Sequence, residues 1–86
     1  MATRGQKIKA GEYEKKYGQE LKIMRIRKNF NQKDVADYLN ITLQQYQKYE
    51  SAINKVSVAT ENKIAEFYGI TRVELVQKIE EQINQK

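Results

Sequence analysis

The chain has 86 residues, of which 40% are hydrophobic, and a formal net charge of +5 at pH 7. This length allows one small domain with a single hydrophobic core and is too short for a layered enzyme fold. The chain contains no Cys, His or Pro, which excludes disulfides, metal sites built on thiolates or imidazoles, and catalysis by either group. No carboxylates form a pair isolated on an apolar face, so we expect neither an enzyme nor a cofactor.

The composition favours an all-α fold. Runs of β-branched residues with period-two alternation are missing, and Gln, Glu, Lys, Leu and Ile dominate. No apolar run approaches the length of a signal peptide or a membrane span, so we expect a cytoplasmic protein with no membrane contact. The positive net charge suits a polyanionic partner.

The first residues are basic and contain almost nothing to bury. Residues 1–11, MATRGQKIKAG, carry Arg4, Lys7 and Lys9 together with two glycines. We therefore expect a flexible basic arm over residues 1–11, followed by a single domain over residues 12–86. Such an arm either contacts the backbone or minor groove of DNA or is a solvated tail, and its composition fits both.

The first helix is predicted over residues 12–28. Its apolar stripe contains Tyr13, Tyr17, Leu21, Ile23, Met24 and Ile26. Gly18 interrupts the pattern at a cost of about 1 kcal/mol relative to Ala, so we expect a break there and a regular helix over residues 19–28. Asn29 would end the helix in the left-handed conformation, and Phe30 would enter the core.

Residues 31–50, NQKDVADYLNITLQQYQKYE, predict two short helices joined by a tight turn. Asn31 followed by Asp34, and Thr42 followed by Gln45, place a capping oxygen three residues ahead of a side chain that can reach back. Asn40 would end the first of these helices. Its buried face would contain Val35, Ala36 and Leu39, and that of the second helix Tyr46, Tyr49 and Glu50.

The opposite side of the second short helix is the candidate functional surface. It carries an exposed row formed by Leu43, Gln44, Gln47 and Lys48. An amphipathic helix with such an amide-rich outer side suits the major groove of DNA. Gln residues also serve simply as solvated helix formers, so the row alone does not indicate DNA contact. The motif around it must support that interpretation.

Two further helices complete the predicted five-helix bundle. After a loop over residues 51–56, Ser57 would cap a helix that ends at Gly69. We expect this helix to bury Val58, Ile64, Ala65 and either Phe67 or Tyr68. Thr71 with Glu74 forms another capping box and starts the last helix, whose apolar residues are Val73, Leu75, Val76, Ile79 and Ile83.

Several short motifs follow one another in a specific order. They are LKIMR (21–25), NQKDVA (31–36), LNIT (39–42), QQYQKYE (44–50), VS (56–57) and AEFYGIT (65–71). In this order and spacing the chain resembles, over residues 21–76, the helix-turn-helix domain of the Cro/cI (XRE) repressor family. The resemblance implies a compact five-helix fold of the lambda-repressor-like type, with a recognition helix over residues 42–50.

The resemblance also implies roles for individual residues. Leu43, Gln44, Gln47 and Lys48 would contact base edges, and Gln32, Thr42, Asn54 and Lys55 would contact phosphates. Arg25 and Glu50 match a buried ion pair that sets the angle of the recognition helix. The chain departs from the family pattern at Ala52, where Gly is usual, at Val56, where Pro is usual, and at Glu61, where a core Leu is common. Without the Gly, the recognition helix would run on or end through Asn54.

These observations lead to a sequence-specific transcriptional regulator of double-stranded DNA, a repressor that binds a palindromic operator as a homodimer. The resemblance places the dimer interface near Arg72, Val73 and Val76. Val76, Ile79 and Ile83 would either extend that interface as a seam or cover the core. The alternative function is an antitoxin or coregulator whose main role is to bind a second protein.

Overall fold

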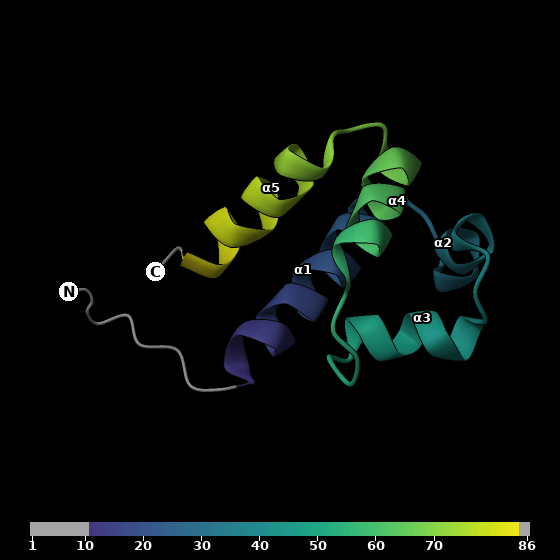
Figure 1. Ribbon diagram of the computed structural model, residues 1–86, viewed down its shortest axis with the longest axis horizontal. Helices are drawn as coiled ribbons and strands as arrows, with labels where there is room; N and C mark the ends of the chain where they lie inside the picture. The colour runs from purple at the N-terminus through teal and green to yellow at the C-terminus, as the bar shows by residue number, and fades with distance from the viewer. Residues whose placement is uncertain (1–10, 85–86) are drawn as a thin grey trace.

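A computed structural model describes residues 11–84 and contains, within that range, five α-helices and no strand (Figure 1). The helices are α1 (Glu12–Arg27), α2 (Gln32–Leu39), α3 (Leu43–Glu50), α4 (Val58–Tyr68) and α5 (Arg72–Asn84). The all-α, five-helix prediction is confirmed. The predicted basic arm lies outside the described residues except for Gly11, which precedes α1 with a φ of 86°.

The helices begin at the predicted caps. Asn31 Oδ1 accepts a hydrogen bond from the Asp34 N–H at 2.8 Å, and the Asp34 carboxylate accepts one from the Asn31 N–H at 2.9 Å. Thr71 and Glu74 form the same reciprocal pair at the start of α5. The hydroxyl oxygens of Thr42 and Ser57 cap α3 and α4. Local side-chain chemistry therefore determines where these helices start.

The helix ends also depend on single residues in the left-handed conformation. Asn29, Asn40 and Gly69 have φ values of 68°, 60° and 74° and end α1, α2 and α4 as predicted. The expectation that α3 runs on or ends through Asn54 is wrong. Ala52 itself adopts a φ of 66°, and the Ile53 N–H donates to the Lys48 carbonyl at 2.9 Å. The family's glycine-type ending is thus kept with Ala in place of Gly.

The core consists of two clusters that share a border. The larger lies between α1, α4 and α5 and contains Tyr17, Leu21, Ile64, Ala65, Leu75, Ile79 and Ile83. The smaller lies between α2 and α3 and contains Val35, Ala36 and Tyr46. Leu39 and Tyr49 pack against both clusters. The small side chain of Ala36, which is 1% exposed, fits the close packing of α2 on α3.

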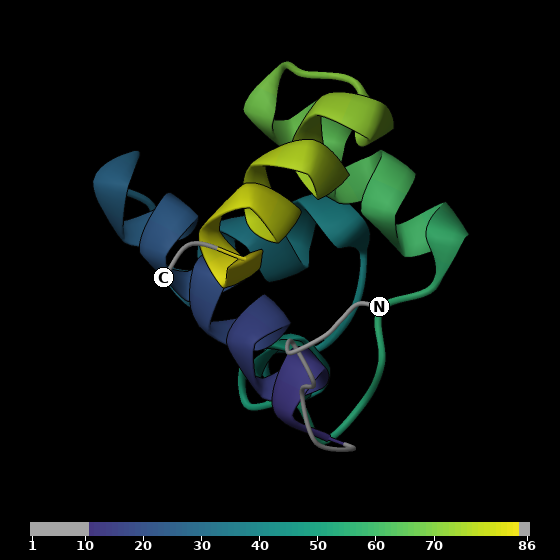
Figure 2. The same cartoon turned by 90° about the vertical axis from the view of Figure 1, so that its left-hand side faces the viewer.

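Helix α1 runs without a break through Gly18, so the predicted interruption is wrong. A Cβ atom at this position would lie 2.4 Å from the Glu50 carbonyl oxygen and 2.8 Å from that of Tyr49. Figures 1 and 2 show the end of α3 against the N-terminal half of α1. Gly18 is therefore needed where the two helix backbones meet, and packing outweighs its low helix propensity.

Several apolar residues expected in the core lie near its edge or outside it. Ile23 and Ile26 are 38% and 54% exposed because the buried stripe of α1 follows Tyr17, Leu21 and Arg25 along the opposite side. Val58, the first residue of α4, is 57% exposed. Phe30 is 36% exposed and packs over the Phe67 ring, with 4.7 Å between the ring centroids.

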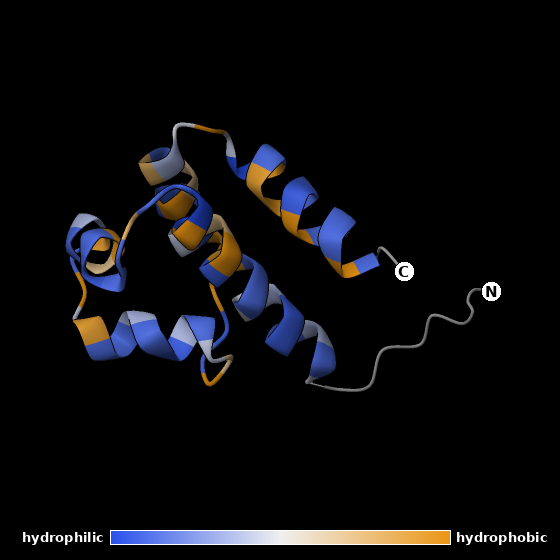
Figure 3. Ribbon diagram, turned by 180° about the vertical axis from the view of Figure 1, so that it is seen from behind, coloured by the Kyte–Doolittle hydropathy of each residue, from blue (hydrophilic) through white to orange (hydrophobic). Residues whose placement is uncertain are grey.

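Helix α5 lies along α1 with its apolar side inward (Figure 3). Ile79 and Ile83 are 1% and 7% exposed and belong to the core, so of the two alternatives expected for them the structure supports the core role and not the seam. Val73 is 60% exposed, and Val76 is half-buried. None of the helices between residues 11 and 84 is long and apolar enough to cross a membrane.

Ala52→Gly should raise the free energy of unfolding by about 1 kcal/mol, because the left-handed conformation costs a residue with a Cβ about that much. Ser51→Gly is the matched control. Ser51 has a φ of −90°, so Gly there should lower the free energy of unfolding. Urea denaturation measures both. A stability loss in Ala52→Gly would contradict the left-handed ending.

Candidate nucleic-acid interface

Helix α3 divides sharply into a buried side and an exposed side. Tyr46 and Glu50 are 1% and 8% exposed and face the core. The other side carries the predicted row of Leu43, Gln44, Gln47 and Lys48, all of them exposed. Seen from behind in Figure 3, α3 is mostly hydrophilic. The short turn after α2 thus presents α3 with its amide-rich side to solvent.

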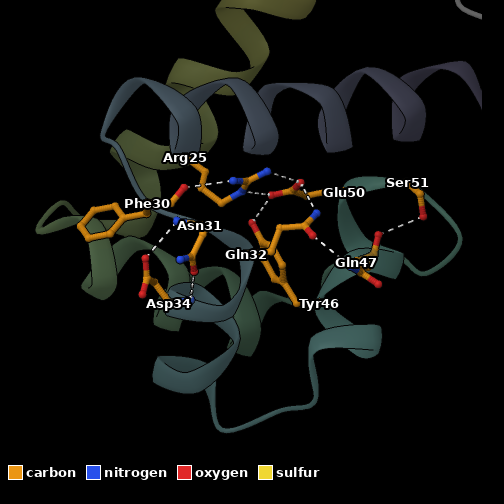
Figure 4. Close-up of polar contacts among 9 residues, drawn as sticks. All are labelled: Arg25, Phe30, Asn31, Gln32, Asp34, Tyr46, Gln47, Glu50 and Ser51. Carbon is orange, nitrogen blue, oxygen red and sulfur yellow. Dashed lines mark hydrogen bonds and ion pairs between the residues drawn. The ribbon is translucent and has the colours of Figure 1, made fainter.

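The orientation of α3 depends on a buried ion pair between Arg25 of α1 and Glu50 (Figure 4). Arg25 Nε lies 2.7 Å from Glu50 Oε2, and a second guanidinium nitrogen donates to Oε1 at 3.1 Å. The two side chains are only 9% and 4% exposed. Arg25 also donates to the Phe30 carbonyl at 3.0 Å. One guanidinium therefore links α1, the end of α3 and the segment that leads into α2.

The Glu50 carboxylate is held in its charged form. Burial alone would raise its pKa, but the hydrogen bonds donated by Arg25, Tyr46 and Gln32 outweigh burial and lower the pKa below its ordinary value of 4.5. The Tyr46 hydroxyl donates at 2.6 Å, and burial together with this bond raises the pKa of Tyr46. Glu50 therefore contributes stability above its ordinary pKa, and that stability is lost as the pH falls through the lowered value.

Gln32 connects this buried pair to the exposed row. Its Nε2 donates to Glu50 Oε1 at 3.0 Å, and its Oε1 accepts a hydrogen bond from Gln47 Nε2 at 3.0 Å. Figure 4 shows the Gln32 side chain lying between the two. Sequence reasoning named all three residues but did not predict these contacts, because residues 15 and 18 positions apart on different helices meet only at a particular crossing angle.

The remaining candidate phosphate contacts lie at the two ends of α3. Thr42 Oγ1 accepts from the Gln45 N–H at 3.0 Å, so its hydroxyl is oriented by the helix start. Asn54 is exposed, and its backbone N–H donates to the Lys48 carbonyl at 3.1 Å. The Lys55 side chain is 80% exposed and its Nζ lies 3.8 Å from a Glu14 carboxylate oxygen. These groups flank the exposed row.

A second buried polar cluster replaces the core Leu common at position 61. Glu61 is 8% exposed and accepts hydrogen bonds from the Tyr17 hydroxyl and, at 2.8 Å, from Arg72 Nε. Burial and the bond to Glu61 raise the pKa of Tyr17. In the sequence, the only sign of this cluster was a charged residue, Glu61, at a position where the family commonly has a core Leu. That sign did not identify Tyr17 and Arg72 as its partners. Arg72, which was expected at a dimer interface, pairs with Glu61 within the chain.

Arg25→Ala should lower the free energy of unfolding by about 3 to 5 kcal/mol, because Glu50 would remain buried without its cation. Lys33→Ala is the control. It breaks the Lys33–Asp37 pair, whose side chains are 70% and 64% exposed, and should cost less than about 1 kcal/mol. Urea denaturation followed by circular dichroism measures both variants. Equal losses would show that the Arg25–Glu50 pair behaves as a surface pair.

Comparison with known proteins agrees with this geometry. A family model described as helix-turn-helix matches residues 21–75. The chain is 29% identical over 70 residues to the cryptic phage CTXphi transcriptional repressor RstR of Vibrio cholerae, covering 81% of this chain and 63% of that protein. It is 41% identical over 49 residues to the uncharacterized HTH-type transcriptional regulator RP497 of Rickettsia prowazekii (strain Madrid E), covering 57% of this chain and 38% of that protein.

The chain therefore spans less than two thirds of the length of either relative. No solved structure matches it significantly. The family match includes the ion pair, the two capped helices and the exposed row, and it covers well over half of the chain. The chain belongs to the helix-turn-helix family of the Cro/cI (XRE) type.

Proposed function

We propose that this protein is a sequence-specific transcriptional regulator that binds double-stranded DNA through α3. The observation that carries the proposal is the exposed row on α3, held outward by a buried ion pair at the end of the same helix. The net charge of +5 favours a polyanionic partner. The names of both relatives, a transcriptional repressor and a transcriptional regulator, support the same function. Repression is the direction we propose.

The row on α3 offers side chains suited to base edges. Gln44 and Gln47 each carry a donor and an acceptor, which suits paired hydrogen bonds to adenine. Lys48 suits guanine O6 and N7, and Leu43, which is 36% exposed, suits a thymine methyl group. Each good paired contact discriminates against the wrong base by about 1 to 3 kcal/mol. The row can therefore distinguish sequences.

The buried pair also determines how Gln47 presents its amide. Because a carboxylate only accepts hydrogen bonds, Gln32 must turn its Nε2 toward Glu50 and its Oε1 toward Gln47. Gln47 must then donate from Nε2. Its Oε1 and second N–H remain for the base, the arrangement that adenine N6 and N7 require. We propose adenine as the base that Gln47 contacts.

Phosphate contacts would position α3 in the groove. Lys55 and Asn54 follow α3, and Thr42 precedes it. Gln32 retains a second N–H beside the backbone N–H groups at the start of α2, where phosphate oxygens bind readily. These contacts carry no sequence information but fix the register of the protein on the duplex.

A homodimer on a palindromic operator completes the proposal. One domain of this size buries too little surface for high affinity, and a twofold pair places two recognition helices about 34 Å apart, one turn of DNA. Val73 at the start of α5 is 60% exposed and is the central residue of the proposed interface, with Arg72 and Val76 beside it. Ile79 and Ile83 lie in the core and take no part.

Replacing both Gln44 and Gln47 with Ala tests the proposal. Site selection from a random DNA pool first identifies the bound sequence, and fluorescence anisotropy then measures affinity across salt concentrations. The double variant should bind the selected site at least about tenfold more weakly, since it loses base contacts. Its affinity for random DNA and its salt dependence should stay the same, because the phosphate contacts remain.

Gln19→Ala combined with Gln82→Ala is the matched control, because both residues are exposed glutamines on other helices. The control should bind like the wild type. A wild type with equal affinity for every duplex, or a Gln44/Gln47 variant that keeps full discrimination, would refute sequence recognition through α3.

Gln32→Met tests the orientation of Gln47 separately. Methionine has a similar length but its sulfur is only a weak hydrogen-bond acceptor, so the Gln47 amide is no longer held in one orientation. Site selection with this variant should show a weaker preference for adenine at one base pair of each half-site and unchanged preferences elsewhere. An unchanged preference at every position would show that Gln32 does not orient Gln47.

A further inference from the structure

A hollow of about 230 Å³ lies between the first turns of α1, the end of α3 and the loop after α3. Tyr13, Tyr17 and Tyr49 line it. The Tyr13 hydroxyl donates to Glu80 at 2.9 Å and the Tyr17 hydroxyl donates to Glu61. The centroids of the Tyr13 and Tyr17 rings are 6.2 Å apart. Because these two hydroxyl groups already have partners, the tyrosines offer a ligand mainly their aromatic rings, beside the polar side chains of the same lining.

Two carboxylates line this hollow, and one of them is paired with a cation more closely than the other. Glu61 pairs with Arg72 Nε at 2.8 Å, and its side chain is only 10% exposed. Glu14 pairs with Lys55 at 3.8 Å, while the Lys55 side chain is 80% exposed. The Glu14 side chain is 32% exposed, and a pair at that distance with one largely exposed partner is worth no more than about a factor of five in an equilibrium constant. The Glu14 carboxylate is therefore the group in the hollow that a competing cation can engage most easily.

We propose that this hollow binds a small organic cation of the alkylammonium class. Aromatic rings attract cations through their negative faces, and the attraction strengthens when the cation is partly desolvated. The lining carries two carboxylates, Glu14 and Glu61, and one ammonium group, Lys55, which disfavours anions. The volume is below the roughly 300 to 1,000 Å³ of pockets that hold drug-sized ligands. The ligand is therefore limited to a few heavy atoms around one positive charge.

The site also connects to the loop after α3, a step that rests on the proposed function. Lys55 pairs with Glu14 in the structure and is the residue we propose for phosphate contact. A cation on Glu14 releases the Lys55 ammonium group for DNA, and DNA that holds Lys55 leaves Glu14 to the cation. The two ligands therefore strengthen each other's binding by the same factor, which the weak Glu14–Lys55 pair limits to about fivefold.

Titration of the full chain, free of DNA, with tetramethylammonium chloride tests the site. The salt replaces sodium chloride at constant ionic strength, and nuclear magnetic resonance follows the signals of each residue. We expect saturable shifts at Tyr13, Tyr17, Tyr49 and Lys55. A parallel titration with tert-butanol, a neutral molecule of similar shape, should give no saturable shift at these residues.

Two matched variants separate the site from net charge. Glu14→Gln should weaken tetramethylammonium binding at least threefold. Glu20→Gln makes the same charge change on α1 but lines a different hollow, and should leave the affinity unchanged. Absence of saturation, equal binding of tert-butanol, or equal weakening in both variants would overturn the proposal.

Affinity for the selected DNA site tests the coupling. Saturating tetramethylammonium should tighten DNA binding by up to about fivefold in the wild type and not in Glu14→Gln. An unchanged wild-type affinity would overturn the coupling. Failure to bind any duplex would count against the proposed function alone, because the titration of the free protein still decides the cation site.

Discussion

The buried pair of Arg25 and Glu50 determines the geometry on which the rest of the structure depends. The carboxylate at the last residue of α3 accepts hydrogen bonds from Arg25, Tyr46 and Gln32, so all its strong partners are supplied by three different helices. Arg25 also donates a hydrogen bond to the carbonyl of Phe30. Apolar contacts are nondirectional, whereas these bonds permit one arrangement of α1, α2 and α3. The angle of α3 is thus set by polar contacts inside the domain.

In the other half of the core, the second polar cluster likewise fixes how the helices are arranged through directional hydrogen bonds. The Glu61 carboxylate accepts hydrogen bonds from Tyr17 of α1 and Arg72 of α5. It lies at the border of the larger apolar cluster, which contains Tyr17. A buried pair of this kind adds little net stability over an apolar replacement but is costly to break. In a domain with so small an apolar core, two such clusters restrict how the helices can slide or rotate against one another.

The sequence was sufficient for features that arise within a few residues. The caps at Asn31 and Thr71 and the left-handed residues at Asn29 and Asn40 involve only neighbours along the chain, and all were predicted. Apart from the left-handed ending at Ala52, which is local, the errors arose where distant segments meet. Gly18 continues α1 because α3 crosses it, and Phe30 and Val58 lie at the surface because of where the helices converge. The Gln32–Gln47 contact likewise depends on a crossing angle that no spacing in the sequence encodes.

The backbone contact at Gly18 has a consequence for how such a domain can diversify. Since the carbonyl groups of Tyr49 and Glu50 rest directly against α1, the spacing of the two helices does not depend on any side chain of the outer row. Leu43, Gln44 and Lys48 can therefore vary while the scaffold stays constant. Gln47 is the one residue of the exposed row that also takes part in the hydrogen bonds around Glu50, through its bond to Gln32. Inherited substitutions should therefore accumulate fastest at the other three positions, because they cost the folded state little.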